Sequence, residues 1–203
     1  MFGKIRLKKN FLLESALLLA LSLALCVGTW ALAESASLSA KLVRLHVLAV
    51  SDDEEEQALK LRVRDSVLDY LAPKLENIES SEDAKEILAA ELRAIADAAA
   101  KAAEGRAVTV SLGREMYPTK QYGAFSLPAG EYDSLKIVLG EGKGHNWWCV
   151  VFPPLCTSAA GAESLQSVMS TDDFAILSEE DGYQLRFRTL ELWGEIKDFF
   201  KSA

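Results

Sequence analysis

The most reactive residue types in this chain gather in one stretch, GEGKGHNWWCVVFPPLC, which runs from Gly140 to Cys156. The stretch contains Cys149, Cys156 and His145, one of only two histidines in the chain. A cysteine acts as a nucleophile when an adjacent base takes its proton, and cysteines and histidines also bind zinc. Two cysteines in an oxidising compartment form a disulfide. The composition therefore allows three kinds of site: a catalytic centre, a metal centre or a structural core.

A catalytic cysteine would be Cys149, with His145 or His46 as its base. His145 lies four residues before Cys149, a spacing that is not typical of any cysteine protease family. Cys149 also lies within the apolar run 147–152, WWCVVF, where a thiolate would be poorly solvated. We therefore expect Cys149 to be buried or disulfide-bonded, and we expect no enzymatic activity. A secreted cysteine hydrolase that acts on the cell envelope is the main alternative.

The other two chemical interpretations of the stretch are weaker. The histidine and the two cysteines are spaced by four and seven residues and have no fourth soft ligand nearby, so we expect no metal. Gly140, Gly142 and Gly144 resemble a phosphate loop, but Gly-Lys is not followed by Ser or Thr. The glycines also lie between two predicted strands instead of opening a helix. They predict a tight turn with positive φ at one or more glycines, and no cofactor.

The N-terminus determines which side of a membrane these residues occupy. It begins with the basic segment MFGKIRLKKN, continues with an apolar run over 16–30 and reaches small residues at Ala31 and Ala33. This order is typical of an export signal with cleavage after Ala33. An uncleaved anchor over 11–32 is the alternative, because about 20 apolar residues span a bilayer. In both cases the basic end stays in the cytoplasm and the rest of the chain lies outside it.

The exported part is acidic and carries two cysteines. Residues 1–33 contain four basic residues and one acid, so the remainder has 18 Lys and Arg against 29 Asp and Glu, a net charge of −11. Such a domain lacks the basic surface that nucleic acids require, and we expect membrane contact only through the N-terminal segment. Cys149 and Cys156 allow a single disulfide; two buried free thiols are the alternative.

The periodicity of residues 43–203 predicts one α+β domain. It follows residues 1–33, a signal peptide or signal anchor, and a short linker over 34–42. Apolar and alternating residues predict strands at 44–50, 107–113, 134–140 and 183–188, and the run 147–152, which is apolar on both faces, predicts a central strand covered on both sides. Helical spacing predicts a helix that follows Asp53 and ends at Pro73, one over 80–105 with Gly105 as its C-cap, and an amphipathic helix over 190–203. Residues 114–133 predict turns with one small hairpin, and 157–177 a loop. The expected fold is therefore a mixed α/β sheet of about five strands, covered by two long helices and a C-terminal helix.

The stretch 140–156 resembles the most characteristic run of the stage II sporulation protein R family. Several other stretches agree with the family in the same order: 44-RLHVLAVSD-52, 57-QALKLRVRDSVLDYL-71, 117-YPTKQYG-123, 127-LPAGEY-132 and 183-YQLRFRTLEL-192. The resemblance covers about residues 43 to 192. Val50 departs from the family, which often has Asn at this position, and 157–177 carry no family feature.

This resemblance implies a signalling protein of endospore formation. Family members are secreted from the forespore into the space between the two forespore membranes. There they activate a membrane-embedded aspartic protease of the mother cell, which processes the sigma-E precursor. The resemblance thus implies a protease as partner. The export signal and the lack of a convincing catalytic constellation both agree with this signalling role. If the signal is not cleaved, the chain stays anchored in the membrane.

An activator shifts its target only by preferring the active conformation, so the chain needs a contact surface. His145, Asn146, Trp147 and Trp148 are our candidates, because Trp contributes strongly to binding at interfaces. The two tryptophans face opposite ways in an extended strand, so we expect at most one to be exposed. A structural component of the envelope or coat is the third functional interpretation.

Overall fold

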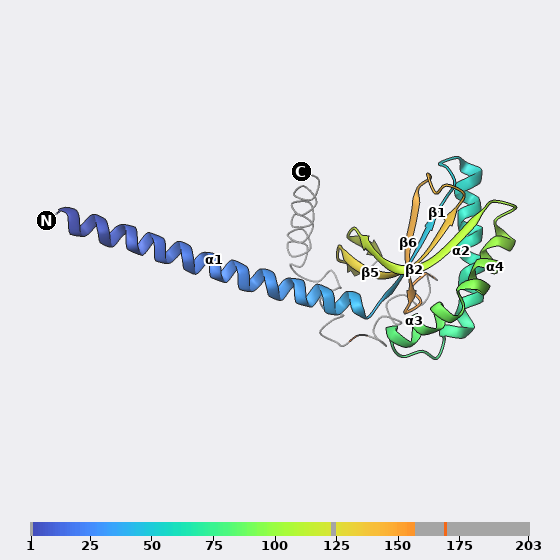
Figure 1. Ribbon diagram of the computed structural model, residues 1–203, viewed down its shortest axis with the longest axis horizontal. Helices are drawn as coiled ribbons and strands as arrows, with labels where there is room; N and C mark the ends of the chain where they lie inside the picture. The colour runs from blue at the N-terminus through green and yellow to red at the C-terminus, as the bar shows by residue number, and fades with distance from the viewer. Residues whose placement is uncertain (1, 123–124, 157–168, 170–203) are drawn as a thin grey trace. The chain divides into compact units, whose positions relative to one another are not determined.

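The structure is a computed structural model that describes residues 2–122, 125–156 and 169 (Figure 1). It divides into two units, residues 1–36 and 37–203. The first consists of most of helix α1 (Phe2–Ala40). Residues 14–40 of this helix are long and apolar enough to cross a membrane, and a signal sequence has the same character.

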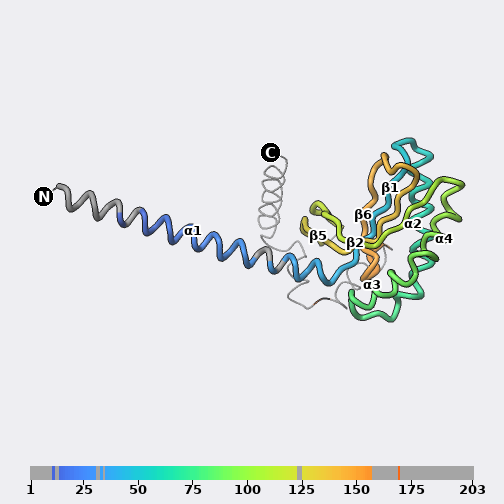
Figure 2. Tube along the Cα trace, viewed as in Figure 1, coloured from blue at the N-terminus to red at the C-terminus, as the bar shows by residue number. Residues whose placement is uncertain are grey.

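In the part of the second unit that the structure describes, helices α2, α3 and α4 accompany a four-stranded sheet and a small hairpin (Figure 2). Its helices are α2 (Glu54–Leu75), α3 (Ser81–Ala90) and α4 (Leu92–Ala102). Its strands are β1 (Val43–Leu48), β2 (Val108–Tyr117), β3 (Lys120–Tyr122), β4 (Phe125–Leu127), β5 (Gly130–Leu139) and β6 (Asn146–Phe152). The sheet order is β2-β5-β1-β6, with β1 parallel to β5 and the other pairs antiparallel.

This architecture confirms the α+β prediction. The described sheet has four strands where about five were expected, because the predicted strand over 183–188 lies outside the described residues. The predicted loop over 157–177, except residue 169, and the terminal helix over 190–203 also lie outside them. The small hairpin expected within 114–133 is present as β3 and β4. The turns expected at the two ends of this range are instead strand, because β2 and β5 continue to pair there, from Arg114 with Asp133 to Tyr117 with Gly130.

The strand register gives the sheet two chemically different faces. One row across the strands consists of Leu112, Leu135, Leu45 and Cys149, and the adjacent row consists of Ser111, Lys136, His46 and Trp148. Side chains alternate between faces along a strand, so the apolar row and the polar row point to opposite sides. The apolar row belongs to the main core, and α2 and α4 lie along that side of the sheet (Figure 1). We call this side the helix face and the opposite side the second face.

Helix α2 lies on the sheet because its apolar residues recur every four positions. Leu59, Val63, Val67, Leu71 and Leu75 are all buried. The expectation that Pro73 ends the helix is wrong: the helix continues to Leu75. Proline removes one backbone donor, but the buried Leu75 keeps the last turn in the stripe that packs on the core.

The single helix expected over 80–105 is in fact two helices, α3 and α4, separated at Glu91. Its carboxylate accepts a hydrogen bond from the Tyr70 hydroxyl and pairs with Lys74 at 3.2 Å, which fixes the break against α2. The C-terminal end also differs from the expectation. Helix α4 ends at Ala102, and the chain then reverses through two positive φ angles, +50° at Glu104 and +84° at Gly105.

A second apolar cluster is separate from the main core and includes Leu38, in the last turn of α1, and Leu42, just after that helix. Its members are Leu38, Leu42, Tyr117, Phe125, Leu127, Tyr132, Val150, Leu155 and Met169. Leu38 and Leu42 are each 1% exposed. The predicted linker over 34–42 thus contains two side chains that belong to the domain's apolar packing.

Leu42→Ala therefore tests whether these residues contribute to the stability of the domain. We expect the free energy of unfolding to fall by about 2–5 kcal/mol, the usual cost of truncating a buried leucine. Leu18→Ala, in the exposed apolar part of α1, is the matched control and should leave it unchanged. Urea denaturation followed by tryptophan fluorescence measures both. Equal midpoints for Leu42→Ala and the unsubstituted chain would contradict the assignment.

Candidate functional site

The glycines of the central stretch form the turn between β5 and β6. Gly140 and Gly142 have φ angles of +56° and +63°, which residues with a Cβ rarely adopt. Gly144 is constrained differently: a Cβ there would lie 2.2 Å from the carbonyl oxygen of Ser51. Its N–H donates to the carbonyl of Ala49 at 3.0 Å. The turn is therefore pressed against the chain that leaves β1.

A polar network holds the same turn against the start of α2. The backbone N–H of His145 donates to Asp52 Oδ1 at 2.6 Å, and the exposed His145 ring contacts the same oxygen. Lys60 Nζ donates to the His145 carbonyl at 2.8 Å and to Gln57 Oε1 at 2.6 Å. Burial lowers the pKa of Lys60, although the Asp52 carboxylate acts in the opposite direction. Lys60 was not predicted as a site residue; its position next to Leu59 in the apolar stripe of α2 was the one feature of the sequence that pointed to it.

The two adjacent tryptophans have different surroundings. Trp147 lies on the helix face, packed against the main core, with the Arg64 guanidinium 4.5 Å from its ring centre. Its indole N–H is buried and has no hydrogen-bond partner among the described residues. Trp148 lies on the second face, half-buried, with Lys120 Nζ 4.7 Å from its ring centre. Both rings are half-buried, but Trp147 is held between the main core and Arg64, whereas Trp148 lies beside the polar side chains of the second face, which makes Trp148 the better candidate for a contact surface.

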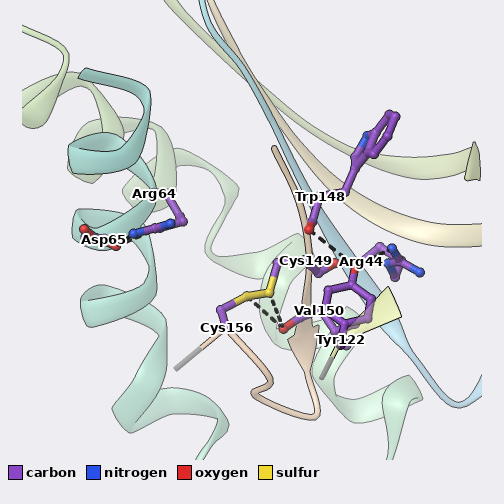
Figure 3. Close-up of a disulfide and its surroundings, with 8 residues drawn as sticks. All are labelled: Arg44, Arg64, Asp65, Tyr122, Trp148, Cys149, Val150 and Cys156. Carbon is purple, nitrogen blue, oxygen red and sulfur yellow. Dashed lines mark hydrogen bonds and ion pairs between the residues drawn. A yellow bond between two sulfur atoms is a disulfide. The ribbon is translucent and has the colours of Figure 1, made fainter. Parts of the chain in front are cut away.

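Cys149 is buried and its sulfur is bonded to that of Cys156 across a Cα–Cα distance of 5.8 Å. Figure 3 shows this disulfide on the helix side of β6, with Trp148 and Arg44 on the opposite side. His46 pairs with Trp148 in the register and therefore also faces away from Cys149. His145 is engaged with Asp52. The structure thus brings neither histidine to the sulfur that a cysteine nucleophile would use.

The second face carries a network that the sequence analysis did not find. His46 Nδ1 lies 3.1 Å from Glu115 Oε2, and His46 Nε2 lies 2.9 Å from Asn146 Oδ1. Glu115 also accepts hydrogen bonds from Lys136 at 2.6 Å and Ser134 at 2.8 Å. Burial would raise the pKa of Glu115, but the hydrogen bonds from Lys136, Ser134 and His46 outweigh it and lower the pKa below its usual value. These residues come from all four strands, so no local pattern brings them together.

Arg44 is the most unusual buried residue of this face, because it is 0% exposed. Its Nε donates to the Cys149 carbonyl at 3.0 Å and its Nη2 to the Tyr122 hydroxyl at 2.8 Å. The rings of Tyr117 and Tyr132 lie 4.3 and 5.0 Å from its central carbon. Nη1 has no hydrogen-bond partner among the described residues. Arg44 is thus a buried cation held by neutral groups.

Two further expectations concern a metal site and the signal cleavage residues. Within residues 2–122, 125–156 and 169, no three His, Cys, Asp or Glu side chains are grouped as a metal site would need. The predicted cleavage residues, Ala31 and Ala33, lie within α1. Cleavage after Ala33 stays a prediction.

Gly144→Ala tests whether the close approach of the turn is required. We expect the free energy of unfolding to fall by about 3 kcal/mol, because the new methyl group meets backbone atoms that cannot move aside cheaply. Gly113→Ala is the matched control, since nothing lies within 4 Å of its added Cβ. The free energy of unfolding of that variant should stay the same or rise by about 0.5 kcal/mol. Equal losses in the two variants, measured by urea denaturation, would refute the explanation.

Alkylation tests the state of the cysteines. In a Cys26→Ser background, which removes the exposed free thiol of α1, we expect iodoacetamide to modify neither Cys149 nor Cys156 in the native protein. After unfolding and reduction, both should react. Mass spectrometry counts the adducts. A rapid single modification at Cys149 in the native protein would instead favour the hydrolase.

Comparison with known proteins identifies the family. The family profile described as stage II sporulation protein R matches residues 39–161. The chain is 40% identical over 118 residues to "Stage II sporulation protein R" of Bacillus subtilis (strain 168), which covers 56% of this chain and 53% of that protein. It thus spans about half the length of this curated relative. No solved structure matches the chain. Since the matched range covers more than half of the sequence, the chain belongs to the stage II sporulation protein R family.

Proposed function

We propose that this chain is an exported signal of sporulation that activates a membrane-embedded protease, which then processes the sigma-E precursor. The observation that carries the proposal is the family match, which includes β1, the glycine turn and β6. The apolar helix α1 fits a signal sequence. The Cys149–Cys156 disulfide suggests an extracytoplasmic location, because such bonds persist in oxidising compartments. We assign the protein to the space between the forespore membranes, either released or anchored through α1.

The arrangement of the candidate site supports a role in binding. The Cys149 sulfur is bonded, His145 is engaged with Asp52, and His46 lies on the other side of the sheet. The chain then acts by stabilising the active conformation of the protease, and its effect is limited by the difference in affinity for the two conformations.

Among the four candidate contact residues, the geometry favours Trp148. Trp147 is packed between Arg64 and the main core, where it supports the fold. Asn146 and His145 are exposed at the start of β6, on the same end of the strand as Trp148. A half-buried tryptophan on rigid strand backbone loses little conformational entropy on binding, which is why such residues dominate many interfaces.

Co-expression with the protease and the sigma-E precursor in a non-sporulating host tests the function. The unsubstituted chain should cause processing of the precursor, and processing should require its export segment. Trp148→Ala should weaken binding about thirtyfold, the effect of losing about 2 kcal/mol at an interface hot spot. Processing should then fall to near background. Immunoblots of the precursor and product measure the outcome.

Arg93→Ala is the control, since Arg93 is exposed on α4, away from the second face. It should leave processing intact. Thermal melting of both purified variants separates loss of contact from loss of folding. Full processing by a well-folded Trp148→Ala variant would rule out Trp148 as the contact, and no processing by the unsubstituted chain would reject the function itself.

A further inference from the structure

The second face differs in charge from the rest of the chain. Its register positions place Arg44, His46 and Lys136 on this side, and Lys120 of β3 lies over Trp148. Glu115 is the one carboxylate that the register of the described strands places there. Even without His46, three formal positive charges face one negative charge on this side. The whole chain, by contrast, has a formal net charge of −8.

The negative charge on this face is already engaged. Glu115 lies 2.6 Å from Lys136 Nζ, in a salt bridge, and accepts further hydrogen bonds from Ser134 and His46. Arg44 and Lys120 therefore have no carboxylate partner among the described residues. Arg44 contacts a carbonyl, a hydroxyl and aromatic rings, and Lys120 contacts the Trp148 ring.

Arg44 adds a buried positive charge beneath this face. Removing a cation from water is costly unless an opposite charge or a full set of hydrogen bonds compensates for it. Arg44 is completely buried and its Nη1 has no acceptor among the described residues. Its charge, shielded from solvent, raises the positive potential of the surface above it, because burial weakens dielectric screening.

The second face is open to a ligand on the side of β2. On this outer strand, Thr109, Ser111 and Gly113 occupy the second face and are exposed. These side chains are small, so an extended chain can lie close to the sheet there and cross β5 and β1 to reach the half-buried Trp148 on β6. Lys136 of the adjacent strand, with a side chain 34% exposed, borders the same area.

We propose that the second face binds an acidic, extended segment of a partner protein. A carboxylate of the segment pairs with Lys120, the positive potential of Arg44 and of Lys136, which is already bonded to Glu115, adds to the attraction, and an apolar side chain of the segment packs on Trp148. This rests on the proposed function, in which the partner is the protease, and it specifies the chemistry of the contact that the protease must supply.

The charge distribution favours a protein segment over an anionic membrane. Electrostatic interactions are screened within about 8 Å at physiological ionic strength. The electrostatic potential on a narrow segment therefore comes mainly from Lys120, Lys136 and Arg44. A planar anionic membrane also experiences the surplus of acids elsewhere on the chain, which repels it.

Direct binding tests the proposal without the protease. The probes are two fluorescein-labelled peptides with alternating Glu and Leu or alternating Lys and Leu, and vesicles that contain phosphatidylglycerol. The full chain is titrated in non-ionic detergent against the peptides, with fluorescence anisotropy as the readout, and against the vesicles after dilution below the critical micelle concentration, with co-sedimentation as the readout. We expect the Glu peptide to bind despite the net charge of the chain, with an affinity that falls as salt is raised.

Matched substitutions locate the binding. Lys120→Glu should weaken binding of the Glu peptide by about tenfold or more, whereas Lys120→Arg should retain it. Lys101→Glu, which makes the same charge change on exposed α4, should have no effect. Equal affinity in all variants, preference for the Lys peptide, or stronger binding to vesicles that depends on Lys120 would each overturn the proposal.

The co-expression assay then separates this inference from the proposed function. If the unsubstituted chain causes processing and Lys120→Glu does not, while Lys101→Glu does, both are supported. If all three cause equal processing, the acidic-segment contact is wrong and the activating function stands. If the unsubstituted chain causes none, the proposed function fails, and the peptide titration still decides the contact chemistry.

Discussion

The pairing of β1 on both of its edges determines where the other parts of the site lie. This six-residue strand lies between β5, to which it is parallel, and β6, to which it is antiparallel. A shift of one residue in either register would exchange the two faces of the sheet. The charged Arg44 would then be placed among the helices, and Leu45 on the polar side. Burial of Val43, Leu45 and Val47 against the helices thus enforces the position of the polar residues between them.

This register also determines which side chains of β6 face the helices and which face the opposite side. Trp147 and Cys149 face the helices, where one packs beneath Arg64 and the other is bonded to Cys156. Trp148 faces the opposite side, next to His46. The glycine turn that precedes the strand is tied to the start of α2 through Asp52. The strand is therefore held on its helix face by the main core and on its second face, through Val150, by the second apolar cluster, which fixes the orientation of the half-buried Trp148.

Much of the fold was predictable from the sequence, because its strands alternate cleanly. Val108, Val110 and Leu112 predicted β2, and the turn glycines were recognised from composition. Contacts between distant elements were not predictable. The break at Glu91 depends on Tyr70 and Lys74 of another helix, and helix α2 passes Pro73 because Leu75 is buried. The candidate site was predicted only in part: the stretch of 140–156 was found, but the Arg44 and Glu115 clusters assemble from separate strands.

The burial of Leu38 and Leu42 sets a narrow margin for maturation of the protein. The predicted cleavage residue Ala33 precedes Leu38 by only five positions. A peptidase that trims a few residues beyond Ala33 removes only chain that precedes the domain's apolar packing, whereas one that trims past Leu38 removes part of that packing. Cleavage at the predicted position would thus leave this packing intact, and removal of a few more residues would lower the stability of the domain.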